Sequence, residues 1–109
     1  MSRSDLVYFN DIIESIDLIL EYLDVKTELE FRSNFLLQDA VIRRFEIIGE
    51  ASSKVSESSK QLYPSIPWNL MKAMRNKLIH EYFGVSAQTI YETAKRDLPV
   101  LKEQLLKII

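Results

Sequence analysis

The sequence predicts an all-α fold, an antiparallel bundle of four to five helices, and two observations lead to this prediction. Only two glycines and three prolines occur in 109 residues, so the chain has few helix breakers. Its apolar residues recur at spacings of three and four, as in helices, rather than at the spacing of two that strands show. A chain of this length is expected to form one domain, residues 1–109, around one core.

The composition excludes several classes of protein. Hydrophobic residues make up 47% of the chain and charged residues 28%, which is too apolar for disorder and too charged for a membrane protein. No stretch resembles a signal peptide or has the roughly 18 apolar residues of a membrane-spanning helix. Without cysteine, disulfides and thiolate metal sites are excluded, and a cytoplasmic location is expected. The net charge of -2 argues against a broad nucleic-acid surface.

The first predicted helix runs from about Ser4 to about Asp24, with Ser4 as its N-cap and Asp5 in its first turn. Its apolar face is wider than one neighbouring helix requires. This face comprises Leu6, Phe9, Ile12, Ile13, Ile16, Ile19, Leu20 and Leu23. We interpret the extra width as surface for a second copy of the chain.

A second helix is predicted over residues 29–54, again with apolar surface to spare. Its apolar residues are Leu37, Val41, Phe45 and Ile48 on one face, and Phe35, Ile42 and Ile47 on other sides. The polar segment "SKVSESSK" that follows is compatible with one short helix before "YPSIP". The prolines of this segment stop one helix, and Pro67 can open the next helix.

The third long helix carries "PWNLMKAMRNKLIHEYF" and is expected to end near Gly84, because glycine suits a left-handed C-terminal position. The last helix is expected to begin at Ser86 as its N-cap. Its core stripe comprises Ile90, Ala94, Leu98, Leu101, Leu105 and Ile108. Pro99 lies inside this helix and removes a backbone donor, so we expect a kink there.

Polar residues of the third helix are predicted to face away from the core. The core stripe is predicted to be Leu70, Met71, Met74 and Leu78. At 100° per residue, Asn76 lies about 200° from Met74, and His80 lies about 240° from it. Asn76 and His80 are four residues apart and share one helix face, with Arg75 at its flank.

Arg75 and His80, the only histidine, together suit cleavage of RNA phosphodiester bonds. A histidine moves protons near neutral pH, and an arginine offers phosphate a planar fork of donors. Because the 2′-hydroxyl of RNA is an internal nucleophile, a metal-free enzyme needs an acid or base near it and a cation for the developing charge. Two subunits would supply two histidines for the two proton transfers. A solvated helix end, where the macrodipole favours histidine, is the alternative.

Three segments resemble the HepT-like toxins of the HEPN superfamily. Their signature is an arginine, a polar residue, three further positions, a histidine, any residue and a tyrosine, and "RNKLIHEY" at residues 75–82 matches it throughout. The segments "RRFEIIGEA" at 43–51 and "SIPWNLMKAMRN" at 65–76 resemble the same family in the same order. The resemblance therefore covers nearly the whole chain.

The resemblance implies a HEPN-like helical homodimer whose motifs face each other across a cleft, acting on RNA as a ribonuclease toxin without metal or cofactor. By position, Arg75 would bind the scissile phosphate, His80 would be the general acid or base, and Asn76 would orient one of them or the RNA. The implied partner is a minimal nucleotidyltransferase (MntA-like) antitoxin that transfers AMP to the motif's tyrosine, here Tyr82. The added charge and bulk would exclude RNA.

Simpler interpretations remain for several residues. Without the resemblance, Tyr82 is a packed aromatic with a hydrated hydroxyl, and Trp68 fills the core or an interface. Glu46 and Glu50 are four apart on one helix face, and they either form a solvated face or approach the arginine cluster. A di-iron bundle is excluded because it requires two histidines. Two other classes stay open: a helical dimer that binds a nucleotide or a protein without cutting, and a purely structural subunit.

Overall fold

The computed structural model describes residues 2–80 and 86–109, without the side chains of residues 77–80. These residues form helices and no β-strand, which confirms the predicted all-α class. The helices are α1 (Arg3–Tyr22), α2 (Glu28–Ser33), α3 (Phe35–Lys54), α4 (Glu57–Leu62), α5 (Trp68–His80), α6 (Ala87–Arg96) and α7 (Leu98–Leu106). None of the helices in the described ranges is both long enough and apolar enough to cross a membrane.

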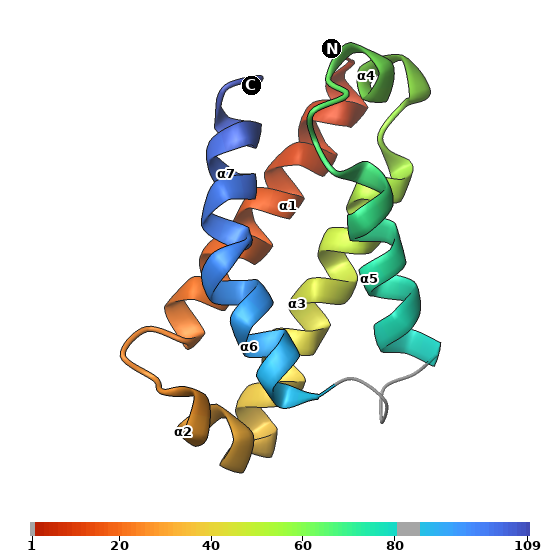
Figure 1. Cartoon of the computed structure of the whole chain (residues 1–109). Helices are drawn as coiled ribbons and strands as arrows, with labels where there is room; N and C mark the ends of the chain where they lie inside the picture. Colours follow the sequence, from red (N-terminus) through yellow and green to blue (C-terminus); the bar gives the residue numbers. More distant parts are fainter. Residues whose placement is uncertain (1, 81–85) are drawn as a thin grey trace.

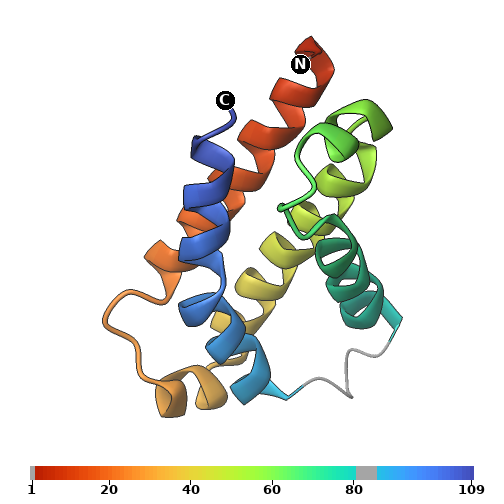
Figure 2. The same ribbon diagram turned by 45° about the horizontal axis from the view of Figure 1, so that its top comes forward.

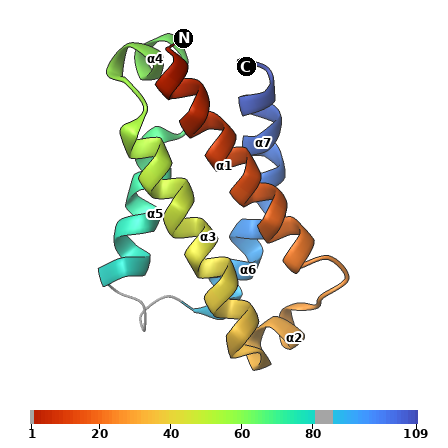
Figure 3. The same ribbon diagram turned by 180° about the vertical axis from the view of Figure 1, so that it is seen from behind.

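The long helices run antiparallel to their neighbours in the bundle. The chain descends through α1, rises through α3, descends through α5 and rises again through α6 and α7, so that both termini lie at the end next to α4 (Figure 1). α3 packs between α1 and α5, and α7 packs along α1. Figures 2 and 3 show the same order from two further directions. α5 therefore lies at one side of the bundle, where it packs mainly on α3.

The core is centred on α1, because α3 and α7 both cover this helix. The fully buried apolar side chains of α1 are Phe9, Ile12, Ile16 and Ile19, and the side chain of its C-cap, Leu23, is also fully buried. These residues of the apolar face are thus used within one chain. Leu6 is 41% exposed, and Ile13 and Leu20 are only partly buried, so a contact of this face with a second copy stays a prediction.

The N-cap of α1 lies two residues before the predicted one. The N-cap is Ser2, whose hydroxyl oxygen accepts a hydrogen bond of 3.0 Å from the Asp5 backbone N–H. Ser4, the predicted cap, is instead an exposed residue of the first turn. This places Asp5 at the third helical position, where its carboxylate turns inward.

The Asp5 carboxylate ties the start of α1 to the start of α4. The residue is 2% exposed and accepts hydrogen bonds from the Ser56 backbone N–H at 2.9 Å, the Ser56 hydroxyl at 2.6 Å and the Ser59 hydroxyl at 2.6 Å. Burial raises the pKa of Asp5, but these hydrogen bonds to the charged form outweigh burial and lower the pKa below its usual range. The carboxylate is therefore held charged at the N-terminus of α4, where the helix dipole favours it.

We expect Asp5→Ala to lower the free energy of unfolding by about 2–3 kcal/mol at pH 7, because a charged acceptor is lost and the buried Ser59 hydroxyl loses its partner. Folding lowers the pKa of Asp5, so its contribution is present above the unfolded pKa and is lost as the pH falls through the folded pKa. In urea unfolding, the difference in unfolding free energy between wild type and Asp5→Ala should therefore become smaller below about pH 4. The control, Asp24→Asn at an exposed position, should stay within about 0.5 kcal/mol of wild type. A difference that persists in acid would contradict this account.

The predicted second helix is two helices, because Asn34 interrupts it. The Asn34 side chain accepts a hydrogen bond of 3.0 Å from the Leu37 backbone N–H and caps α3. The Gln38 side-chain amide donates to the carbonyl oxygens of Phe31 and Arg32 near the end of α2, at 2.9 and 3.0 Å. Since the backbone groups at both new helix ends find side-chain partners, the break is stable.

The predicted last helix is also divided, although its cap and its core stripe are confirmed. The Ser86 hydroxyl accepts a hydrogen bond of 3.1 Å from the Thr89 backbone N–H at the start of α6. The buried residues of this stripe are Ile90, Ala94, Leu98, Leu101 and Leu105, and Ile108 is partly buried. Pro99 is the second residue of α7, where a backbone N–H has no acceptor inside the helix. The expected kink is thus a break between two helices.

Candidate active site

The helix that carries the motif, α5, is anchored at its start by Trp68. The carbonyl oxygen of Pro67 accepts from the Met71 backbone N–H at 3.1 Å, so Pro67 directly precedes the first helical residue. Trp68 is buried, its Nε1–H donates to the Tyr63 carbonyl oxygen at 3.1 Å, and its ring centroid lies 5.7 Å from that of Phe9. Trp68 is therefore a core residue, whereas the sequence left open whether it fills the core or an interface.

The face of α5 that meets the rest of the protein differs from the predicted stripe. Met71 is buried and Met74 partly buried, as predicted, but Leu70 is 71% exposed. The side chain of Leu78 lies outside the described part of the chain. α5 packs on α3 through Met71 and Arg75, which are four residues apart. Leu70 lies beside this contact, where it lines an apolar cavity and stays largely exposed.

Arg75 is half-buried where α5 crosses Gly49 of α3. A Cβ atom added to Gly49 would overlap the Cβ of Arg75, and it would lie 2.9 Å from the Arg75 Cγ and 3.0 Å from the Met71 carbonyl oxygen. Ordinary carbon contacts are near 3.5–4.0 Å. The two helices therefore approach so closely at this point that only glycine fits.

The Arg75 guanidinium is fixed on one edge and unsatisfied on another. Its Nη2 donates to the side-chain oxygen of the half-buried Asn76 at 2.7 Å. Its Nε is buried and has no hydrogen-bond partner among the described residues. No carboxylate in residues 2–80 or 86–109 is found in an ion pair with it. A buried donor without an acceptor costs about 1–3 kcal/mol, so this position requires an explanation, and a catalytic role is one of those known for such groups.

The two glutamates considered from the sequence do not neutralise Arg75. Glu46 pairs with Arg43 on its own helix, with 3.3 Å between Glu46 Oε2 and Arg43 Nη1. Glu50 forms no ion pair with any residue that the structure describes. Within the part of the chain that the structure describes, no carboxylate therefore pairs with the charge of Arg75.

The structure brings two of the four predicted site residues together. Arg75 and Asn76 are in contact through their side chains. His80 is the last residue of α5, four positions beyond Asn76, and its side chain lies outside the described part of the chain. Tyr82 and the expected helix end at Gly84 lie outside the described residues altogether. Gly49 was given no role from the sequence, although a glycine in the middle of a predicted helix is a signal of close packing.

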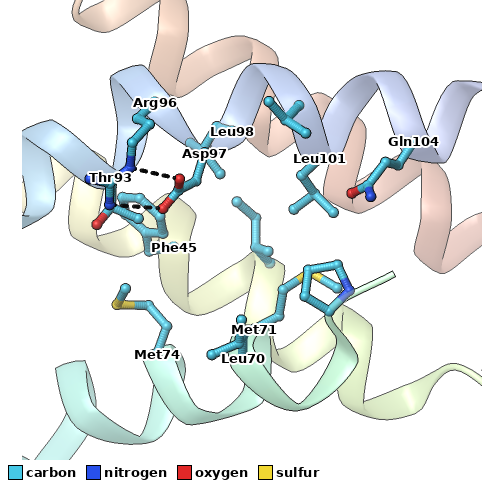
Figure 4. Close-up of a pocket in the computed structure, with 13 residues that line it drawn as sticks. Phe45, Leu70, Met71, Met74, Thr93, Arg96, Asp97, Leu98, Leu101 and Gln104 are labelled. Carbon is cyan, nitrogen blue, oxygen red and sulfur yellow. Dashed lines mark hydrogen bonds and ion pairs between the residues drawn. The ribbon is translucent and has the colours of Figure 1, made fainter. Parts of the chain in front are cut away.

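A separate apolar cavity of about 480 Å³ opens between α5 and the α6–α7 pair (Figure 4). Its lining includes Met71 and Met74 from one side and Leu98 and Leu101 from the other, whereas Arg75 does not line it. Its charged groups are Arg96 and Asp97, whose Nε and Oδ1 atoms lie 2.9 Å apart, and this hydrogen bond raises the pKa of Arg96. The cavity lacks a free cation among its lining groups, so it does not suit phosphate.

Comparison with known proteins shows one family. Residues 12–108 match the family model described as "Ribonuclease HepT-like". The chain is 47% identical over 109 residues to a protein of Methanocaldococcus jannaschii named "Gamma-glutamylcyclotransferase and putative RNase", and 44% identical over 108 residues to "Probable ribonuclease HepT" of Thermococcus cleftensis. No solved structure matches the chain.

The extent of the match differs between these relatives. All of the chain aligns with the Methanocaldococcus protein but covers 49% of that protein's length. With the Thermococcus protein, the alignment covers 99% of the chain and 98% of the relative. A further Methanocaldococcus jannaschii protein, a "Putative RNase", is 39% identical over 110 residues, with 91% of its length covered.

Proposed function

The chain belongs to the HepT-like ribonuclease family, and from this premise we propose that it is a metal-independent endoribonuclease toxin with its site at Arg75, Asn76 and His80. The observation that carries the proposal is the state of Arg75. Its guanidinium is oriented by Asn76 at 2.7 Å, and its buried Nε has no acceptor among the described residues. An arginine held in this way is prepared to bind a phosphate with its remaining donors.

In the proposed reaction, the 2′-hydroxyl oxygen of RNA attacks the adjacent phosphorus atom, and the bond from phosphorus to the 5′-oxygen of the next nucleotide breaks. His80 of one subunit accepts the proton of the 2′-hydroxyl, and His80 of the second subunit gives a proton to the leaving 5′-oxygen. Arg75 stabilises the negative charge on the non-bridging phosphate oxygens. The products are a 2′,3′-cyclic phosphate and a 5′-hydroxyl.

A homodimer of one-domain protomers, residues 1–109 each, is part of the proposal, because one histidine cannot serve as acid and base at once. The exposed side of α5 supports such a contact. Leu70 is 71% exposed on the helix that carries the motif, and the small Ala73 is exposed three residues later. An exposed leucine gains by burial, and a small residue lets a second helix approach closely.

Cleavage of total cellular RNA in EDTA tests the proposal. Protein with the native mass of a dimer at micromolar concentration should give discrete products that end in a 2′,3′-cyclic phosphate. A monomeric mass would contradict a site composed of two subunits. If a folded dimer cuts no RNA, the hypothesis of a non-catalytic binding module gains instead.

We also propose that a minimal nucleotidyltransferase antitoxin inactivates the enzyme through Tyr82. The tyrosine oxygen would attack the α-phosphorus of ATP, form a new phosphorus–oxygen bond and displace pyrophosphate. Tyr82 follows His80 by two residues, so the transferred AMP would lie near the motif. Its negative charge and bulk beside a phosphate-binding arginine would exclude RNA.

We expect Tyr82→Phe to cut RNA within about threefold of the wild-type rate while escaping inactivation, because only the acceptor oxygen is removed. After incubation with the nucleotidyltransferase and ATP, mass spectrometry should find one AMP on wild type and none on Tyr82→Phe. Tyr91→Phe is a matched control, because the Tyr91 hydroxyl already donates a hydrogen bond of 2.6 Å to the Lys26 carbonyl oxygen. The Tyr91→Phe variant should be modified like wild type. AMP attached to any other residue would rule out Tyr82 as the acceptor.

A further inference from the structure

Gly49 lies in the middle of α3 and takes no part in the proposed chemistry. A glycine in a helix interior weakens the helix relative to alanine, so its presence needs a reason. Gly49 is buried, and its carbonyl oxygen accepts a hydrogen bond of 2.9 Å from the buried Ser52 hydroxyl. The reason lies across the contact with α5, where Arg75 occupies the space that a side chain would fill.

The crowding at Gly49 comes from atoms that cannot move aside alone. An added Cβ would overlap the Cβ of Arg75, which is bonded to the backbone and follows it, and would lie 3.0 Å from the Met71 carbonyl oxygen, which is itself backbone. Rotation of a side chain therefore cannot relieve the overlap. α5 would have to move away from α3 by on the order of 1 Å to restore ordinary contact distances.

We infer that Gly49 is a positioning residue for Arg75: its missing side chain sets the distance between α3 and α5 and thereby the place of the guanidinium. The inference rests on the proposed function, because the position of Arg75 matters only if Arg75 acts on RNA. The Arg75 stem rests on Gly49, and its guanidinium is oriented by Asn76. The shift of α5 that an added Cβ requires is large enough to misplace a catalytic group by about the distance that costs a hundredfold in rate.

Steady-state kinetics of RNA cleavage by the chain of residues 1–109 test the inference. Gly49→Ala should lower kcat by about 10- to 100-fold and change KM much less, because the loss concerns transition-state charge rather than general RNA binding. Ser53→Ala, an exposed position on the same helix four residues later, is the matched control, because it also raises helix propensity. It should stay within about twofold of wild type. A wild-type kcat for Gly49→Ala would overturn the inference.

A second background tests whether the overlap with Arg75 is the cause. Arg75→Gly removes the Cβ that an alanine at position 49 would meet, so adding Gly49→Ala should change the residual activity of Arg75→Gly by less than about twofold. Equal losses in both backgrounds would overturn the inference. If Gly49→Ala alone does not fold, a double variant that folds supports the overlap, and a double variant that also fails to fold overturns it.

The NMR signal of the Arg75 Nε–H group gives a readout that does not depend on activity. This group is buried and unpartnered among the described residues, so its proton should exchange slowly with water in the wild type. In Gly49→Ala the signal should move or exchange faster, and in Ser53→Ala it should not. If the wild-type protein cleaves no RNA, the proposed function is wrong, but the Nε–H signal still tests whether Gly49 positions Arg75. A signal that is the same in Gly49→Ala as in wild type would overturn the inference.

Discussion

His80→Ala is expected to lower kcat for RNA cleavage by a factor of about 10²–10⁴ in EDTA, because the proposed acid and base are both lost from the dimer. The wild-type rate should show a bell-shaped dependence on pH, since one histidine must be neutral while the other is protonated. His80→Ala should lose this dependence near neutral pH. Single-turnover cleavage of a short RNA across pH 5 to 9 measures both effects.

Two controls separate lost chemistry from lost structure in His80→Ala. Native mass and urea unfolding should match those of wild type, because the substituted residue is the last of α5. Imidazole added to the solution should restore part of the activity, since it supplies the missing proton carrier. Activity of His80→Ala within tenfold of wild type would exclude His80 as the acid and base, and would favour the binding module.

The parts of the fold that the sequence predicted are those decided by regular apolar spacing. The stripe that begins at Ile90 is buried as predicted, and Ser86 caps α6 as predicted. The failures occur where one polar side chain outweighs the spacing. The Asn34 side chain accepts a hydrogen bond from the Leu37 backbone N–H and divides a helix that the apolar spacing predicts to be continuous. The first helix is capped by Ser2 rather than Ser4, and its Asp5 is hydrogen-bonded to Ser56 in a buried cluster.

The sequence placed Asn76 and His80 on one face of a helix with Arg75 at its flank, and the side chains of Arg75 and Asn76 are hydrogen-bonded. That these residues form a catalytic site stays a prediction. The exposure of Leu70 and the crossing at Gly49 depend on how α5 is rotated against α3, and spacing within one helix does not determine that rotation. The sequence showed that Gly49 lies inside a predicted helix, but it did not show that Arg75 packs against this glycine. The roles of Arg75, Asn76, His80 and Tyr82 all stay predictions.

Arg75→Lys is expected to lower kcat for RNA cleavage by about 10²–10³-fold although the positive charge is kept. A lysine ammonium is a point charge without the planar fork of an arginine, so it cannot hold the Asn76 oxygen and a phosphate in a fixed geometry at once. The same substitution at the exposed Arg3 of α1 is the control, and it should leave kcat within about twofold of wild type. Single-turnover rates and the affinity for a non-cleavable RNA with 2′-O-methyl groups measure chemistry and binding separately.

The expected pattern for Arg75→Lys is a large loss in rate with a smaller loss in affinity, because charge attraction survives while the transition-state contact does not. Asn76→Ala should lower the wild-type rate but have little further effect in the Arg75→Lys background, since Asn76 acts by orienting the guanidinium at 2.7 Å. If Arg75→Lys instead retains the wild-type rate, charge alone is sufficient at this position. The buried Nε without an acceptor would then have no part in the reaction, and the orientation of the guanidinium by Asn76 would not be a catalytic feature of the site.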